Sequence, residues 1–167
     1  YIDWADMDKD GPLCAEQMLY AACFRAMAEI SEQIGKDGSV YRAEYEKLTA
    51  VIEKFFWDEE KGAYIDSFTS GRRNVTRHAN IFAILFSVAD EKKQEKILKN
   101  VLENDEIPAI TTPYFNFFEL DVLCRMGKLT EVLDKIRSYW GGMLDLGAVT
   151  FWEEYDPSVP KEEQYDM

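Results

Sequence analysis

The stretch HANIFAILFSVADEKKQEKILKNVLE, residues 78–103, contains two different kinds of helix in succession. Residues 78–89 are nearly all apolar, which predicts a helix that is buried on most of its sides. Residues 91–103 are dominated by lysine, glutamate and glutamine, and the apolar positions that remain are Ile97, Leu98, Val101 and Leu102. The stretch therefore predicts a hairpin of one inner, buried helix and one outer, surface helix.

The same alternation occurs on both sides of this stretch. Residues 13–34 are apolar around most of a helix, and residues 39–56 carry one apolar stripe. Residues 113–126 are again apolar and aromatic, and residues 128–140 are amphipathic. The lengths are uneven and no sequence recurs at a fixed period, which argues against a helical solenoid. We therefore predict an all-α fold of alternating inner and outer hairpins, about half of an (α/α)6 toroid.

Such a half toroid would expose the apolar faces of its first and last inner helices. We therefore expect residues 1–167 to be a fragment of a single catalytic domain, completed by the remainder of the same barrel.

Two connecting segments have distinctive sequences. Residues 57–68 contain a turn followed by alternating residues, which predicts a short β-hairpin. Residues 141–157 follow an outer helix, and we expect them on a rim of the toroid.

The composition excludes some classes of partner. The net charge is −13, with 19 basic against 32 acidic residues, which argues against nucleic acid and anionic membranes but is compatible with sugars. No apolar run could span a membrane. No signal peptide is visible, and a periplasmic, extracellular or cytoplasmic place in a bacterium stays open. One histidine and three scattered cysteines argue against a metal site or a disulfide framework, and we expect buried thiols.

The strongest candidate for chemistry is the segment from Thr150 to Asp156. It holds the carboxylates Glu153 and Glu154 among three aromatic residues, Phe151, Trp152 and Tyr155. Glycosidases use two carboxyl groups, and aromatic rings stack on the apolar faces of sugars. The alternative interpretation is an acidic surface loop anchored by its tryptophan.

The opening of the chain, residues 1–12, is a second candidate. In a sugar-binding site Asp3 would hydrogen-bond hydroxyl groups and Trp4 would stack on the ring. The four aspartates of this segment suggest calcium, but their spacing does not match an EF-hand loop. The alternative interpretation is a solvated loop that leads into the first helix.

Polar residues also begin two of the inner helices. Arg77, His78 and Asn80 cluster at the start of one, where they would face a ligand or a polar network. A structural role for His78 remains the alternative to substrate binding. The segment from Thr111 to Phe115 begins the other, and it is sufficiently explained by Thr112 as N-cap followed by Pro113 in the first turn.

These residues together resemble the α-L-rhamnosidases of glycoside hydrolase family 78. The resemblance covers essentially the whole chain, and its motifs occur in a matching order: Ile2-Asp3-Trp4, Phe56-Trp57-Asp58 with Asp66, Arg77-His78-Ala79-Asn80, Thr112-Pro113-Tyr114-Phe115, Tyr139-Trp140-Gly141-Gly142-Met143 and Thr150-Phe151-Trp152-Glu153-Glu154. It implies an (α/α)6 barrel that releases terminal α-L-rhamnose from a rhamnose-containing glycoside with inversion, and it implies no cofactor.

The resemblance also implies roles for individual residues. Glu153, directly after the tryptophan of the last motif, corresponds to the general base, with Glu154 as the fallback. Asp3, Trp4, His78 and Trp152 would contact the substrate. The family's general acid lies upstream of the Asp-Trp motif, outside these residues, so we expect the chain to be inactive alone. The alternatives are another (α/α)6 carbohydrate hydrolase and a non-catalytic helical-repeat binding module.

Overall fold

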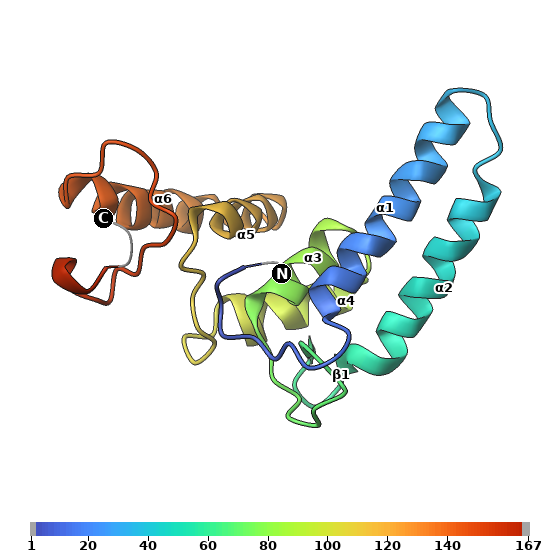
Figure 1. Cartoon of the computed structure of the whole chain (residues 1–167), viewed down its shortest axis with the longest axis horizontal. Helices are drawn as coiled ribbons and strands as arrows, with labels where there is room; N and C mark the ends of the chain where they lie inside the picture. Colours follow the sequence, from blue (N-terminus) through green and yellow to red (C-terminus); the bar gives the residue numbers. More distant parts are fainter. Residues whose placement is uncertain (1–2, 165–167) are drawn as a thin grey trace. The chain divides into compact units, whose positions relative to one another are not determined.

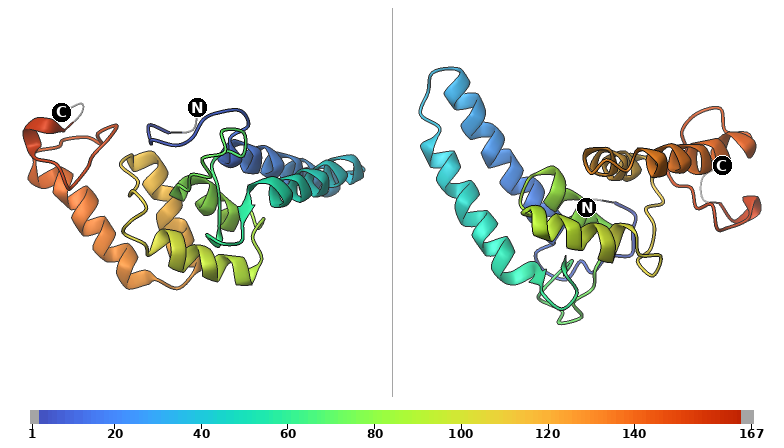
Figure 2. Two further views of the ribbon diagram at one scale, coloured as in Figure 1. Left: turned by 90° about the horizontal axis from the view of Figure 1, so that it is seen from below. Right: turned by 180° about the vertical axis from the view of Figure 1, so that it is seen from behind.

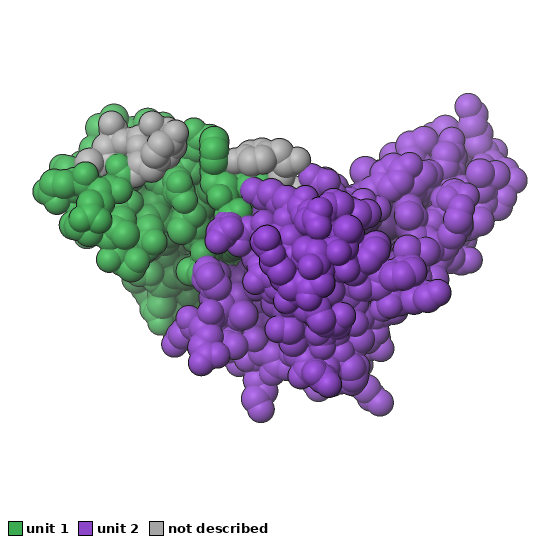
Figure 3. All heavy atoms as spheres, turned by 60° about the horizontal axis from the view of Figure 1, so that its bottom comes forward, with its two compact units in different colours: residues 1, 3–5, 109–167 green, residues 2, 6–108 purple. Residues whose placement is uncertain are grey.

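The structure, a computed structural model, describes residues 3–164 and divides them into two compact units. Unit 1 comprises residues 3–5 and 109–164, and unit 2 comprises residues 6–108 (Figure 3). Each unit consists mainly of helical hairpins, which confirms the predicted all-α class. Ile2, part of the predicted opening motif, lies outside the described residues.

Unit 2 begins with a long hairpin of α1 (Cys14–Gln33) and α2 (Ser39–Phe56), which lie side by side (Figure 1). The connection passes through Gly38, where a Cβ atom would lie 2.6 Å from the backbone oxygen of Ala28. Only glycine permits this close approach of the connection to α1. Helix α1 also packs on α3 (Arg77–Leu85), so it contacts both helical hairpins of the unit.

A two-stranded hairpin follows α2, as the sequence predicts. Strand β1 (Trp57–Asp58) pairs with β2 (Ala63–Tyr64) in antiparallel register, with Trp57 opposite Tyr64. Asp58 closes the turn, because its Oδ1 accepts hydrogen bonds of 3.0 Å from the N–H groups of Glu60 and Lys61.

The second hairpin of unit 2 is the one predicted from residues 78–103. All nine residues of α3 (Arg77–Leu85) are buried, which confirms an inner helix. The outer helix begins at α4 (Glu91–Ile97), capped by Asp90, and continues as a π-helical segment η1 (Leu98–Leu102) (Figure 2). The predicted single α-helix over 91–103 is thus two helical segments of different winding.

Unit 1 contains the third hairpin, α5 (Pro113–Arg125) and α6 (Leu129–Asp145), followed by an irregular segment and the short helix η2 (Lys161–Glu163). Thr112 caps α5 and Pro113 occupies its first turn, as predicted. Helix α6 extends beyond the predicted end at residue 140, through Gly141 and Gly142, because tertiary packing overrides the low helix propensity of glycine.

Two inner helices keep an apolar face exposed. On α1 this face includes Tyr20, Met27 and Ile30, and on α5 it includes Tyr114 and Phe117. The interpretation of residues 13–34 as buried on most sides is therefore too broad.

The three cysteines differ in burial. All three are free thiols, but among them only Cys14 is buried. Cys23 and Cys124 are exposed, because they lie at helical spacing from the exposed apolar residues of α1 and α5. The expectation of buried thiols is wrong for these two residues.

Candidate active site

Glu153 lies on the irregular segment that follows α6, and its side chain is exposed. Its Oε1 accepts a hydrogen bond of 3.0 Å from the indole Nε1 of Trp4. No described residue donates to its Oε2. One carboxylate oxygen of Glu153 therefore has a hydrogen-bond donor, and the other has none among the described residues.

The neighbouring carboxylate points to a different partner. Glu154 is half-buried, and its Oε1 accepts a hydrogen bond of 2.7 Å from the hydroxyl of Thr111. In an irregular backbone, successive side chains can point in different directions, and here each glutamate has its own partner. This contact distinguishes two adjacent residues that the sequence leaves equivalent.

Thr111 and Thr112, immediately before α5, connect the segments of unit 1. The carbonyl of Thr111 accepts hydrogen bonds from the Tyr155 N–H at 2.7 Å and from the Tyr139 hydroxyl at 2.6 Å. Thr112 donates its hydroxyl to Asp3 Oδ2 at 3.0 Å and accepts the Phe115 N–H at 3.3 Å. The two threonines thus hold the Glu154–Tyr155 backbone and the segment of Asp3 beside the start of α5.

The residues on either side of the two glutamates, Trp152 and Tyr155, belong to an aromatic cluster with Tyr139. Tyr155 packs edge-on against Tyr139, with ring centroids 5.3 Å apart, and Trp152 packs against Tyr155 at 5.8 Å. Burial raises the pKa of the Tyr139 hydroxyl, which therefore stays protonated and able to donate. Gly142 makes room for this cluster, since a Cβ there would lie 2.3 Å from the Tyr155 hydroxyl.

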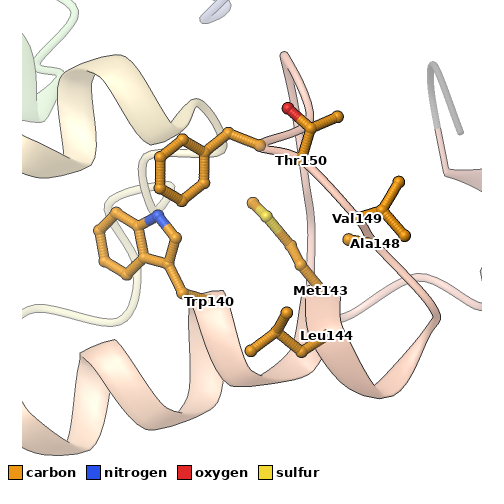
Figure 4. Close-up of a pocket in the computed structure, with 7 residues that line it drawn as sticks. Trp140, Met143, Leu144, Ala148, Val149 and Thr150 are labelled. Carbon is orange, nitrogen blue, oxygen red and sulfur yellow. The ribbon is translucent and has the colours of Figure 1, made fainter.

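Two hollows adjoin the segment that carries Glu153. A groove of about 550 Å³ is lined by Phe151, Trp152, Glu153 and Lys161, together with residues 146–150. The second, of about 360 Å³, is apolar: Trp140, Met143 and Leu144 of α6 face the segment of Ala148, Val149 and Thr150 (Figure 4). The groove is wide enough for a small ligand and has one carboxylate on its wall.

The predicted site residues fall into two groups. Asp3, Trp4, Trp152 and Glu153 all belong to unit 1, as does Glu154. Asp3 is 5% exposed and Trp152 is half-buried against the aromatic cluster, while Trp4 is 49% exposed.

His78 belongs to unit 2, where it is buried in the first turn of α3. Its neighbours Arg77 and Asn80 serve a polar network rather than a ligand. Arg77 donates to the carbonyls of Leu102, Asn104 and Ile107, and Asn80 accepts the Tyr64 N–H and donates to two carbonyls.

Thr111 belongs to a segment that the sequence explained by helix capping alone, so its contact with Glu154 was not predicted. The signal that could have found it is the doubled threonine before Pro113, since one threonine suffices as the N-cap.

Residues 3–164 contain no group of three His, Cys, Asp or Glu side chains arranged to hold a metal ion. Asp8, from the acidic opening, instead accepts hydrogen bonds from the Ser70 hydroxyl and the Asp10 N–H. None of the helices in this part of the chain is long and apolar enough to cross a membrane.

Comparison with known proteins gives relatives for nearly the whole chain. Residues 1–166 match the bacterial alpha-L-rhamnosidase six-hairpin glycosidase domain. A rhamnosidase from Klebsiella oxytoca, solved with rhamnose bound, is 29% identical with a TM-score of 0.78 and is matched over 95% of this chain. A family 78 rhamnosidase of Bacillus sp. GL1 is 28% identical, with a TM-score of 0.83, over 93% of this chain.

This chain spans 30% of the length of the Klebsiella protein and 17% of that of the Bacillus protein. No curated protein matches it. The family match, by contrast, extends from the first described residue to the last and includes both glutamates and all three helical hairpins. The chain belongs to the family of bacterial α-L-rhamnosidases with a six-hairpin glycosidase domain.

Proposed function

We propose that this chain is part of the catalytic domain of an inverting α-L-rhamnosidase and that Glu153 is its general base. The observation that carries the assignment is the difference in exposure and hydrogen bonding between the two glutamates. Glu153 is exposed on the wall of a groove and its Oε2 has no donor among the described residues, whereas Glu154 is half-buried and bound by Thr111. A base needs a free oxygen that a water molecule can reach.

The chemistry follows from this placement. In an inverting glycosidase the base removes a proton from water as the water oxygen attacks the anomeric carbon. The glycosidic bond breaks on the opposite face, and a general acid about 6.5–9.5 Å from the base protonates the departing oxygen. We place that acid outside residues 1–167, so these residues supply one half of the pair.

Rhamnose-containing glycosides are the proposed substrates. The support is the family match and the bound rhamnose of the Klebsiella relative. The aromatic residues beside the groove, Phe151 and Trp152, have the character of sugar-binding walls. We also propose that residues 1–167 alone do not hydrolyse p-nitrophenyl-α-L-rhamnopyranoside, because the proposed general acid lies outside them.

The test compares Glu153→Gln and Glu154→Gln in the protein that carries this chain. Loss of a general base lowers kcat by about 10²- to 10⁴-fold, which we expect for Glu153→Gln. Glu154→Gln keeps an oxygen for the Thr111 hydroxyl and should retain most of the activity. NMR of the first product should show β-L-rhamnose, the inverted anomer. Full activity of Glu153→Gln would remove Glu153 from the mechanism. Assays on p-nitrophenyl glucoside and glucuronide test the alternative that the protein is another (α/α)6 carbohydrate hydrolase.

A chemical rescue makes the assignment sharper. Azide attacks the anomeric carbon without losing a proton, and the bonding electrons leave with p-nitrophenolate, so this reaction needs no base. Added azide should therefore restore p-nitrophenolate release in Glu153→Ala and give β-rhamnosyl azide. A variant whose defect lies in folding or in substrate binding would gain nothing from azide.

A further inference from the structure

The hydrogen bond between Trp4 and Glu153 joins residues that are 149 positions apart. Glu153 needs such a contact, because its backbone lies outside any helix or strand and its side chain is exposed. An exposed glutamate on an irregular segment samples several rotamers, and each of them sends the carboxylate in a different direction. The indole N–H selects the rotamers in which Oε1 lies 3.0 Å away.

Trp4 can act in this way because its own backbone is anchored. Asp3 is buried and accepts the Thr112 hydroxyl at 3.0 Å, and Thr112 in turn caps α5 by accepting the Phe115 N–H. The indole therefore projects from a segment that is bound to the end of a 13-residue helix. Glu153 lies next to Glu154 and Tyr155, which Thr111 binds at the same end of α5, so both partners of the contact are anchored there.

The chemistry of the two groups suits a positioning role. An indole N–H is a donor without an acceptor, and an ionised carboxylate is an acceptor without a donor. The contact therefore occupies one oxygen of Glu153 and leaves the other with its full capacity to accept a proton from water.

We propose that Trp4 is a positioning residue, which aims Oε2 of Glu153 at the attacking water by holding Oε1. This inference rests on the proposed function of Glu153 as the base. It differs from the substrate-stacking role expected from the sequence, which would use the face of the indole ring rather than its N–H.

The first test is Trp4→Phe, which keeps an aromatic face and removes the donor. A misaligned catalytic group costs about 10- to 100-fold in rate, so kcat for p-nitrophenyl-α-L-rhamnopyranoside should fall by that factor. KM should stay within about threefold, since ground-state binding does not use this bond. A rise of KM with unchanged kcat would mean that Trp4 binds substrate through its ring, and would overturn the proposal.

Trp57→Phe is the matched control. The Trp57 indole donates to Glu59 Oε2 at 2.6 Å in unit 2, so the variant removes the same type of bond from a pair that has no part in the proposed site. It should leave kcat and KM unchanged. Thermal unfolding of both variants checks that each remains folded, which the 49% exposure of Trp4 favours.

A double-mutant cycle separates aiming of the base from every other role. In the Glu153→Ala background with azide, the reaction uses no base, so adding Trp4→Phe should change the rate of azide-dependent release by less than about twofold. An equal loss in both backgrounds would show that Trp4 acts elsewhere. If the proposed role of Glu153 as the base were wrong, Glu153→Gln would be fully active, whatever the effect of Trp4→Phe.

Discussion

The hydroxyl of Thr111 lies 2.7 Å from Oε1 of Glu154, and the same residue's carbonyl receives the backbone N–H of Tyr155. Thr111 thus binds two consecutive residues of the candidate site, one through its side chain and one through its backbone. Glu154 is the more enclosed of the two glutamates, and its charge requires this donor.

Removing the donor should therefore cost stability. For Thr111→Val we expect unfolding free energy to fall by about 1–2 kcal/mol, because a half-buried carboxylate loses its hydrogen bond. Thermal or urea unfolding measures the change. Thr130→Val, at an exposed position of α6, is the control and should change stability by less than about 0.5 kcal/mol. Equal effects of the two substitutions would contradict a structural role for the bond.

Adjacent glycines of α6 should respond in opposite ways to alanine. Gly142→Ala would place a Cβ atom 2.3 Å from the Tyr155 hydroxyl, so the aromatic cluster must shift and we expect a loss of about 1–3 kcal/mol. Gly141 has nothing within 4 Å of the same position. Gly141→Ala should therefore gain up to about 1 kcal/mol from helix propensity. The unfolding temperatures of the two variants give the comparison directly, and similar shifts would be inconsistent with the packing of Tyr155.

Asp58 should make stability depend on pH. Burial raises the pKa of Asp58, but hydrogen bonds from the Lys61 N–H and from Arg73 outweigh it and hold the pKa below its usual value. A carboxyl with a lowered folded-state pKa stabilises the protein above its unfolded-state value, and this contribution is lost as pH falls through the folded-state pKa. Asp58→Asn should therefore cost about 1–2 kcal/mol near pH 7 and progressively less below about pH 4.

The measurement is the difference in unfolding free energy between wild type and Asp58→Asn from pH 7 down to pH 3. Asp134→Asn supplies the control, because Asp134 pairs with Arg137 at 3.2 Å while both side chains are largely exposed. That pair should contribute little at any pH. A difference for Asp58→Asn that stays constant down to pH 3 would refute the proposed titration.

Asn80 should be among the most sensitive polar positions. It is fully buried, accepts the Tyr64 N–H at 2.8 Å, and donates to the carbonyls of Tyr64 and Thr76 at 2.9 Å each. Asn80→Ala leaves these backbone groups buried without partners, and we expect a loss of about 3 kcal/mol or more. Asn100, with one hydrogen bond of 3.0 Å to the Lys61 carbonyl, gives the matched control, and Asn100→Ala should cost about 1 kcal/mol. A smaller loss at position 80 than at position 100 would overturn this ranking.

Most of the helical order could be predicted because hydrophobic periodicity reports burial locally. The run from Ile81 to Leu85 is entirely apolar, and the structure buries all of it. The π-helical turn after Ile97 could not be predicted, because its sequence has ordinary amphipathic spacing. The exposed face of α1 could not be predicted either. Apolar residues such as Met27 and Ile30 indicate a face that would be stabilised by packing, but the sequence does not show whether a packing partner is present.

The candidate site was only partly predictable for a related reason. The residue types of Trp152 to Glu154 indicated a carbohydrate site, but adjacent glutamates have nearly the same local sequence. Their difference comes from Trp4 and Thr111, which contact them across long separations in the chain. Those pairings depend on the tertiary fold, which no local pattern encodes.

Unit 1 is discontinuous in the chain, since residues 6–108 are inserted between its first segment and its helices. During synthesis, Trp4 emerges from the ribosome well before Glu153, from which it is separated by 149 positions. At about 5–20 residues per second, the delay is roughly 7–30 s. The hairpins of unit 2 can form within that interval, whereas the hydrogen bond between Trp4 and Glu153 must wait until residue 153 has been synthesised. The proposed site can therefore assemble only after all of unit 2 has been synthesised.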